Sequence, residues 1–387
     1  MNPLANKLAI LLLLGVWVAL FAFVWNDPGQ QFDFKTYYVA SHAYEVGQNP
    51  YDVSALRAIG RQEHLLAFYY PLSTLQLFRP LGELDYPAAH RIWLALKALA
   101  LIALLVVWKR GFLSTSHWPV VLLVTLLAFN AATVWDVKTG NVSVFEELFL
   151  WVGLAFFVAG RMTLFAVCIL VASMAKLMPA AFLLLLWLPA VRSRGNAVRF
   201  VAAAVAVAAL ALVPFIANAD YLGAFARGLM SQPPRFVHNP TMVGLIGELS
   251  RRHDWLASGW VRWTLVAGWY AALVGVSLPL LRDAFRHRSR VVIVLVAALA
   301  YAIFAPRLIV YSYMIAIVPA LVLLPAVTER RALRPVAFVV ALCIGGLAVL
   351  PGAGLAWLGA AAPLILLVLC WVALIDLHHS GGLVGAS

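Results

Sequence analysis

Long apolar runs recur along the chain, and they restrict its possible folds more than any other feature. A helix that crosses a bilayer needs about 20 mostly apolar residues, within a range of about 17–25. Only 11% of the residues are charged, less than half of the roughly 25% typical of soluble domains. The sequence therefore predicts an all-α, polytopic integral membrane protein with a single domain over residues 1–387. Seven runs reach the spanning length: 5–25, 90–108, 118–135, 199–217, 259–281, 308–326 and 355–376.

Three shorter apolar runs and one ambiguous segment complete the pattern. The shorter runs are 144–159, 291–304 and 335–350. The ambiguous segment, 162–190, is apolar on both sides of an interruption that contains Lys176 and Pro179. It can form either one long buried helix or two short helices that meet at the interruption.

The distribution of basic residues predicts the orientation and settles this choice. Half of the 28 Lys and Arg residues lie in linkers and helix flanks of one side, together with only two acids, Asp283 and Glu329. By the positive-inside rule that side is cytoplasmic. Arg161 and Arg192 both belong to it, so the segment 162–190 crosses the membrane twice or not at all. Two short helices there give about 12 spans with both termini in the cytoplasm.

Two long loops face outward in this topology, 26–90 and 218–258. Within the first loop, Val53–Leu66 has apolar residues at helical spacing, which is typical of a helix that lies flat at the membrane surface. The apolar stretch 68–81 is too short to span and is expected to be a re-entrant or interfacial segment. In the second loop, three prolines within 232–240 predict an ordered, non-helical path.

Asp33 is the candidate catalytic residue. It follows the first apolar run closely, and its sequence neighbours include the aromatic residues Phe32, Phe34, Tyr37 and Tyr38. A partly desolvated carboxylate has a raised proton affinity, which suits a general base that takes a proton from a hydroxyl. The alternative interpretation is a solvated loop carboxylate or a helix cap.

Three basic residues are candidate ligands for an anion. A lysine inside apolar sequence, such as Lys176, indicates either a lipid phosphate bound at membrane depth or a lysine that only caps a short helical hairpin. Arg307 lies in a tight outward turn and is either a phosphate clamp or an ordinary interface anchor. His238 and its neighbour Asn239 follow the proline-rich bend, where a histidine is either a site residue or incidental.

A polar turn at 135–141 ends at Asn141, and Glu146 and Glu147 follow it at the start of the next apolar run. The amide and carboxylate groups of this region either bind sugar hydroxyls or cap helices.

Some classes of protein are excluded by what the sequence lacks. It contains no Walker loop, no Gly-x-Gly-x-x-Gly and no Asp-x-Asp motif. A soluble nucleotide-binding domain and a nucleotide-sugar metal site are therefore not expected. Nucleic acid is not an expected partner either, because the basic residues recur in short clusters between apolar runs.

Several short motifs occur in order within residues 33–81 and at Lys176. They are Asp33-Phe34-x-x-Tyr37-Tyr38, Gly47-x-Asn49-Pro50-Tyr51, Tyr70-Pro71, Pro80-Leu81 and Lys176-x-x-Pro179. Together they resemble glycosyltransferase family 87, one of the GT-C glycosyltransferases that use lipid-phosphate sugars. His238 also fits the family pattern, whereas the turn at 305–307 departs from the more usual Ser-Pro. The resemblance covers most of the chain in topology and implies a GT-C fold.

The resemblance implies a hexosyltransferase that moves a hexose, expected to be mannose, from a polyprenyl-phosphate sugar to a lipid-linked or glycan acceptor with inversion. Asp33 would deprotonate the acceptor hydroxyl. Lys176, Arg307 and His238 would neutralise the leaving phosphate, so that no metal or other cofactor is required. The reaction is expected at the periplasmic face of a bacterial inner membrane. The residues expected to bind substrate are Lys35, Tyr37, Tyr38, Tyr70, Asn141 and Asn239.

A lipid-sugar flippase or secondary transporter is the alternative function. Such a protein would also be a helical bundle with buried charge, but internal repeats and paired broken helices are typical of transporters. The sequence has one such break, at Lys176, and no repeat. A membrane scaffold would need neither Asp33 nor Lys176.

Overall fold

The computed structural model is helical throughout the part of the chain that it describes. Every regular element within that part is an α-helix or a short 3-10 helix, as the apolar runs predict. The structure describes residues 3–61, 65–114, 116–216, 218–231, 236–256, 258–287, 289–328 and 356–379.

Six helices of the described residues are long and apolar enough to cross a bilayer. They coincide with six of the seven long apolar runs, and only 308–326 differs. That run is divided into the 3-10 helix η4 (Val310–Ala316) and the helix α14 (Ile317–Thr328). The six are α1 (Pro3–Asn26), α5 (Tyr86–Gly111), α6 (Trp118–Thr139), α9 (Arg194–Ile216), α12 (Gly259–His287) and α16 (Ala356–His379).

Shorter helices fill the centre of the bundle. The runs 144–159 and 291–304 form α7 (Ser143–Val158) and α13 (Arg290–Phe304). The run 335–350 lies outside the described residues, so the total of about 12 spans and the GT-C fold stay predictions. The main hydrophobic core joins α5, α6, α7 and α8 to α13, α14 and α16, with Trp108, Trp151 and Trp371 among its largest buried side chains.

The ambiguous segment forms two short helices, α8 (Met162–Ala175) and the 3-10 helix η2 (Met178–Trp187). Their junction is at Lys176, whose backbone is extended, with φ −149° and ψ 141°. Pro179 lies in the first turn of η2, where its missing N–H leaves no helical hydrogen bond unmade. The predicted pair of helices that meet near Lys176 and Pro179 is therefore confirmed.

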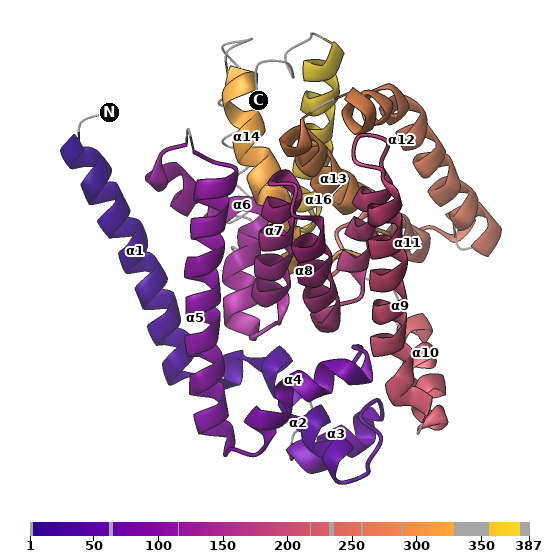
Figure 1. Ribbon diagram of the computed structural model, residues 1–387. Coiled ribbons are helices and arrows are strands. Elements are labelled where there is room, and N and C mark those ends of the chain that lie inside the picture. Colours follow the sequence, from indigo (N-terminus) through magenta and orange to yellow (C-terminus); the bar gives the residue numbers. More distant parts are fainter. Residues whose placement is uncertain are drawn as a thin grey trace.

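A layer of short helices covers one end of the bundle (Figure 1). The predicted surface helix is present but stops at Gly60, because Arg61 adopts a left-handed conformation with φ 48°. The stretch 68–81 contains an 11-residue helix, too short to span. The elements of this layer are η1 (Pro28–Gln30), α2 (Phe32–Glu45), α3 (Val53–Gly60) and α4 (Leu72–Gly82).

The second long loop contributes three more helices, α10 (Ala219–Ser231), α11 (Met242–Arg252) and η3 (Asp254–Leu256). α10 lies beside the layer of short helices (Figure 1). Residues 236–240 of the proline-rich bend form a turn and a stretch without regular structure, non-helical as predicted, while 232–235 lie outside the described residues.

A second run also departs from its predicted form. The run 118–135 appears as a single span, but α6 changes direction where Phe129, Asn130 and Ala131 adopt left-handed conformations, with φ values of 52°, 58° and 55°. Such residues cost about 1–3 kcal/mol each and persist only where their surroundings hold them in place. Phe129 stacks on the ring of Tyr313, with centroids 5.7 Å apart, and both side chains are buried. After the break, the end of α6 contacts the start of α2.

Candidate active site

The site is built around the turn that joins α6 to α7. Gly140 ends α6 with φ 73°, and a Cβ at this position would lie 2.8 Å from Cβ of Phe34 and 3.0 Å from Cβ of Gln31. Only glycine therefore permits both the left-handed turn and the close approach of α2. Nε2 of Gln31 donates to the carbonyl of Val137 at 3.3 Å, and Nε1 of Trp93 donates to the carbonyl of Gly140 at 2.9 Å. These contacts fix the first turn of α2, which carries Asp33, against the end of α6.

Asn141, the next residue, connects the polar groups of the site. Its Nδ2 donates to Oδ2 of Asp33 at 2.9 Å and to Oη of Tyr37 at 2.8 Å, and it lies 3.2 Å from Oη of Tyr70. Its Oδ1 accepts hydrogen bonds from the backbone N–H and the hydroxyl of Ser143, at 3.1 and 2.9 Å. With both ends of the amide engaged, the orientation of Asn141 is fixed, and its N–H groups point at the carboxylate of Asp33 and at the tyrosine hydroxyls.

Asp33 is buried, with 8% of its surface exposed. Burial raises the pKa of its carboxyl group, and hydrogen bonds from Asn141 and Thr139 partly oppose that rise. The residue at the cap position of α2 is Gln31, not Asp33. Asp33 is therefore neither a solvated loop carboxylate nor a helix cap. It is a desolvated carboxylate held by a fixed amide, which is the environment of a general base.

Lys176 belongs to the same network. Its Nζ lies 2.7 Å from Oε2 of Glu146, donates to the hydroxyl of Ser143, and donates to the hydroxyl of Ser312 at 3.2 Å. It also lies over the ring of Tyr311, 5.2 Å from the centroid. Ser143 thus joins Lys176 to Asn141. The side chain of Lys176 keeps 15% of its surface exposed.

A second ion pair lies deeper and was not predicted. Nζ of Lys97, on α5, is 2.6 Å from Oδ2 of Asp136, and neither side chain has any exposed area. The same ammonium group donates to the backbone carbonyl of Asn141. The sequence does carry a signal for Lys97, because it is a lysine within a long apolar run, the same rule that identifies Lys176. The pairing with Asp136 is visible only in the fold.

Tyr37 and Tyr70 complete the site on the side of the short helices. Oη of Tyr37 donates to Oη of Tyr70 at 2.8 Å, and their rings meet edge to face with centroids 5.1 Å apart. Of the residues predicted from the sequence, Asp33, Tyr37, Tyr70, Asn141 and Lys176 are thus brought into one network.

The other predicted residues lie elsewhere. Lys35 and Tyr38 project from a different face of α2, where Nζ of Lys35 lies over the ring of Tyr86, 5.1 Å from its centroid, and Oη of Tyr38 donates to the carbonyl of Leu84 at 2.7 Å. Their predicted contact with substrate stays a prediction. Tyr311, which is not among the residues predicted above, contacts Lys176 and Asp33.

His238, Asn239 and Arg307 gather at a separate place. Oδ1 of Asn239 accepts from the backbone N–H of Leu308 at 2.7 Å, and its Nδ2 donates to the carbonyl of Pro306 at 3.3 Å. Asn239 therefore joins the bend that contains His238 to the turn that contains Arg307. His238 is exposed, and the guanidinium of Arg307 lies over the ring of Tyr69, 5.8 Å from the centroid.

Within the described residues, His, Cys, Asp and Glu side chains form no group of three or more that is arranged to hold a metal ion. Activity without a metal stays a prediction.

These features define an integral membrane protein with a buried polar site at one end of an apolar helical bundle. A family model named glycosyltransferase family 87 matches residues 68–306, more than half of the chain, and the protein belongs to that family. No curated protein and no solved structure matches the chain. The protein is accordingly a membrane glycosyltransferase, which uses a sugar donor and an acceptor. Asn141, Glu146 and Lys176 lie within the matched segment, and Asp33 precedes it.

Proposed function

We propose that this glycosyltransferase moves a hexose, in the first instance mannose, from a polyprenyl-phosphate sugar to a lipid-linked or glycan acceptor. The reaction takes place at the periplasmic face of a bacterial inner membrane, with inversion at the anomeric carbon. The observation that carries the proposal is the buried carboxylate of Asp33, which the amide of Asn141 holds at 2.9 Å in one network with the ammonium group of Lys176.

Asp33 acts as the general base. Its carboxylate takes the proton of the acceptor hydroxyl while the hydroxyl oxygen forms a bond to the anomeric carbon of the sugar. The bond between that carbon and the phosphate oxygen breaks on the opposite face, and its electron pair leaves with the polyprenyl phosphate. Asn141 aims the carboxylate, and the hydroxyls of Tyr37 and Tyr70 form the polar surface beside it.

Lys176 neutralises the departing phosphate. Its partner in the protein without substrate is Glu146, so a bound phosphate shares or replaces this carboxylate as counter-ion. A charge fixed in a partly desolvated site stabilises developing charge better than one in water. Arg307 and His238, joined through Asn239, are secondary candidates for the phosphate, and Lys35 and Tyr38 for the sugar.

The substitution Asp33→Asn tests the proposal. Asparagine has nearly the same size and can hydrogen-bond, but it accepts no proton at neutral pH. Turnover is expected to fall by roughly 10²–10⁴-fold, the usual contribution of a general base, while binding of the polyprenyl-phosphate sugar is retained. Asp85→Asn is the matched control, since Asp85 is an exposed carboxylate of the same loop.

A loss of activity in Asp33→Asn can come from a catalytic defect or from a folding defect, and two measurements on one preparation distinguish them. Specific activity per folded molecule and thermal unfolding are measured together on the purified variant. If Asp33→Asn lowers only the unfolding temperature and keeps specific activity near normal, Asp33 has no catalytic role, and Glu146 or His238 takes its place as candidate base. Analysis of the lipids of a deletion strain by mass spectrometry identifies the sugar and the acceptor.

A further inference from the structure

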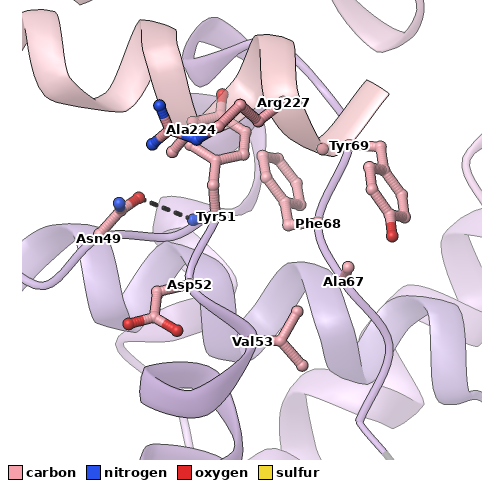
Figure 2. A pocket seen from close by; sticks show the side chains of 10 residues that line it. Asn49, Tyr51, Asp52, Val53, Ala67, Phe68, Tyr69, Ala224 and Arg227 are labelled. Carbon is pink, nitrogen blue, oxygen red and sulfur yellow. Dashed lines mark hydrogen bonds between the residues drawn. The ribbon is translucent and has the colours of Figure 1, made fainter. Parts of the chain in front are cut away.

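A cavity of about 410 Å³ lies beside the candidate active site. α10 forms one wall with Ala224 and Arg227, and residues 49–53 and 67–69 form the others (Figure 2). Its volume falls within the range of about 300–1,000 Å³ that is usual for small-molecule sites. None of the steps proposed above uses this cavity.

The lining combines aromatic faces with hydrogen-bond donors. The rings are those of Tyr51, Phe68 and Tyr69. Oδ1 of Asn49 accepts from the backbone N–H of Tyr51 at 3.0 Å (Figure 2), which leaves its Nδ2 to donate. Arg227 supplies a guanidinium group. Aromatic rings that pack on C–H faces, next to groups that donate to hydroxyls, suit a sugar ring.

One oxygen of the carboxylate at the cavity wall is already engaged within the protein. Oδ1 of Asp52 accepts from the backbone N–H of Ser54 at 2.9 Å and from its hydroxyl at 2.6 Å. Asp52 is thus the N-cap of α3. The lining therefore offers donors from Asn49 and Arg227 and an acceptor from Asp52, which suits hydroxyl groups that both donate and accept.

Two lining residues of the cavity, Tyr51 and Phe68, contact residues of the network around Asp33. Oη of Tyr51 donates to the backbone carbonyl of Tyr70 at 2.8 Å, and the hydroxyl of Tyr70 is part of the network around Asp33. Phe68 lines the cavity and packs against Tyr37 and Tyr70, with centroids 6.4 and 5.6 Å away. The lining of the cavity is therefore in contact with the network around Asp33.

A candidate membrane span, α9, lies next to the lining residue Tyr51. Tyr51 stacks on Phe215 near the end of α9, with centroids 6.1 Å apart, and packs against Phe225 of α10 at 5.3 Å. Next to Phe215, the side chain of Ile216 is 79% exposed, and Leu212 one turn earlier is 55% exposed. Because α9 is a candidate membrane span, these exposed apolar side chains face acyl chains.

We propose that this cavity binds a sugar unit in the headgroup of a lipid-linked acceptor, with the hydrocarbon chain along the exposed face of α9. The inference rests on the proposed function and names the acceptor side of that reaction. A headgroup held between Tyr51 and Arg227 presents its reacting hydroxyl past Tyr70 to the carboxylate of Asp33.

The experiment fills the cavity and measures use of the acceptor. Ala224→Phe places a ring inside it, and Ala226→Phe, on the same helix but not in the lining, is the matched control. The purified full-length protein is assayed with polyprenyl-phosphate mannose as donor and octyl α-mannopyranoside as acceptor. Ala224→Phe is expected to raise the KM for octyl mannoside roughly tenfold or more, as loss of a site contact of 1.4 kcal/mol or greater does, with hydrolysis of donor alone unchanged.

A second variant guards against a folding defect. Arg227 is exposed, so Arg227→Gln should leave thermal unfolding unchanged and still raise the acceptor KM. If wild-type protein consumes the donor but neither variant alters the acceptor KM, the cavity is not the acceptor site, and the proposed function stands.

Failure of the proposed function gives a different result. If wild-type protein does not consume the donor at all, binding of octyl α-mannopyranoside is measured directly by saturation-transfer NMR. A signal that Ala224→Phe removes and Ala226→Phe keeps supports the sugar site without the reaction. Equal signals in both variants, or equal binding of methyl and octyl α-mannopyranoside, overturn the assignment to a lipid-linked sugar.

Discussion

Two lysines lie in apolar segments of this protein, and each is paired with a carboxylate near Asn141. Lys97 lies inside the continuous helix α5 and pairs with Asp136 at 2.6 Å, with no exposed area on either side chain. Lys176 lies at the junction of two short helices, pairs with Glu146 at 2.7 Å, and keeps 15% of its side chain exposed.

The difference indicates two separate roles. Removing two charges from water is costly, and a fully buried pair contributes little net stability while loss of one partner is severe. The sealed pair holds the carbonyl of Asn141 and so fixes the amide that aims Asp33. The partly exposed pair has access for a ligand. We therefore expect the first pair to position the site and the second to bind a ligand within it.

The largest expected effect belongs to the sealed pair. Lys97→Met leaves Asp136 buried without its counter-ion and is expected to lower the free energy of unfolding by about 3–5 kcal/mol. Thermal unfolding in detergent measures the loss. The double variant Lys97→Met with Asp136→Leu removes both charges and should recover most of the stability. If the single variant is as stable as wild type, the sealed pair is not structural.

The second effect belongs to the accessible pair. Lys176→Met is expected to weaken donor binding by about 1.5–3 kcal/mol, the range for a charge-assisted contact, with a smaller loss of stability than Lys97→Met. The matched control is the double variant Lys176→Met with Glu146→Gln. It removes the carboxylate that the single variant leaves unpaired, so that the remaining change in donor binding comes from loss of the lysine. Unchanged donor affinity in both variants would make Lys176 a structural residue like Lys97 and Arg307 the better candidate for the phosphate.

The third effect is a shift with pH. Burial raises the pKa of Asp33, and a general base is active only when ionised. Turnover is therefore expected to fall as pH decreases through a pKa above that of an ordinary aspartate, about 3.9. Asn141→Leu removes a hydrogen bond that favours the charged form, so the acidic limb of log kcat against pH should move to higher pH. If the acidic limb does not move, Asn141 does not affect the pKa of Asp33.

The linked effect on stability has the opposite direction from that of a salt-bridged carboxylate. Because the folded state raises the pKa of Asp33, it binds this proton more tightly than the unfolded chain does. The contribution to stability is present at low pH and is lost as pH rises through the folded pKa. Asp33→Asn should therefore reduce the pH dependence of the unfolding temperature in this range.

The smallest effect tests the tyrosine side of the network. Tyr70→Phe removes the hydroxyl shared with Tyr37 and Asn141 and is expected to lower turnover about 2–10-fold, which corresponds to one neutral hydrogen bond of about 0.5–1.5 kcal/mol. Tyr44→Phe, a partly buried tyrosine outside the network, is the control. A loss of turnover larger than the loss caused by Lys176→Met would indicate that Tyr70, and not Lys176, is the main residue for donor binding.

Much of the fold could be predicted because membrane solvation is a strong local constraint. Apolar runs of spanning length identify the six long helices, and a charge in such sequence identifies Lys176. The sequence also allows a prediction of which residues share a face of α2. Asp33 and Tyr37 are four residues apart and share a helical face, while Lys35 and Tyr38 do not. The predicted contact of Lys35 and Tyr38 with substrate takes no account of these faces and stays a prediction.

The rest of the site depends on tertiary packing. Nothing in the sequence Phe129-Asn130-Ala131 requires three left-handed residues, since only asparagine tolerates this conformation readily. That break sets the course of the end of α6, and with it the position of Asp136 opposite Lys97. The pairing of two charges from different helices needs the register of both helices, which periodicity does not supply.

The lengths of α7 and α8 predict how deep the polar network lies in the bilayer. With 16 and 14 residues, they extend about 24 and 21 Å at 1.5 Å per residue, whereas the hydrocarbon core of a bilayer is about 30 Å thick. Both lead from the turn at Gly160 to the polar network. With that turn at one membrane surface, the network lies several ångströms below the other, or the bilayer thins around it. Bilayer thickness then becomes a determinant of rate, and proteoliposomes made from lipids of graded acyl length should show an optimum of turnover.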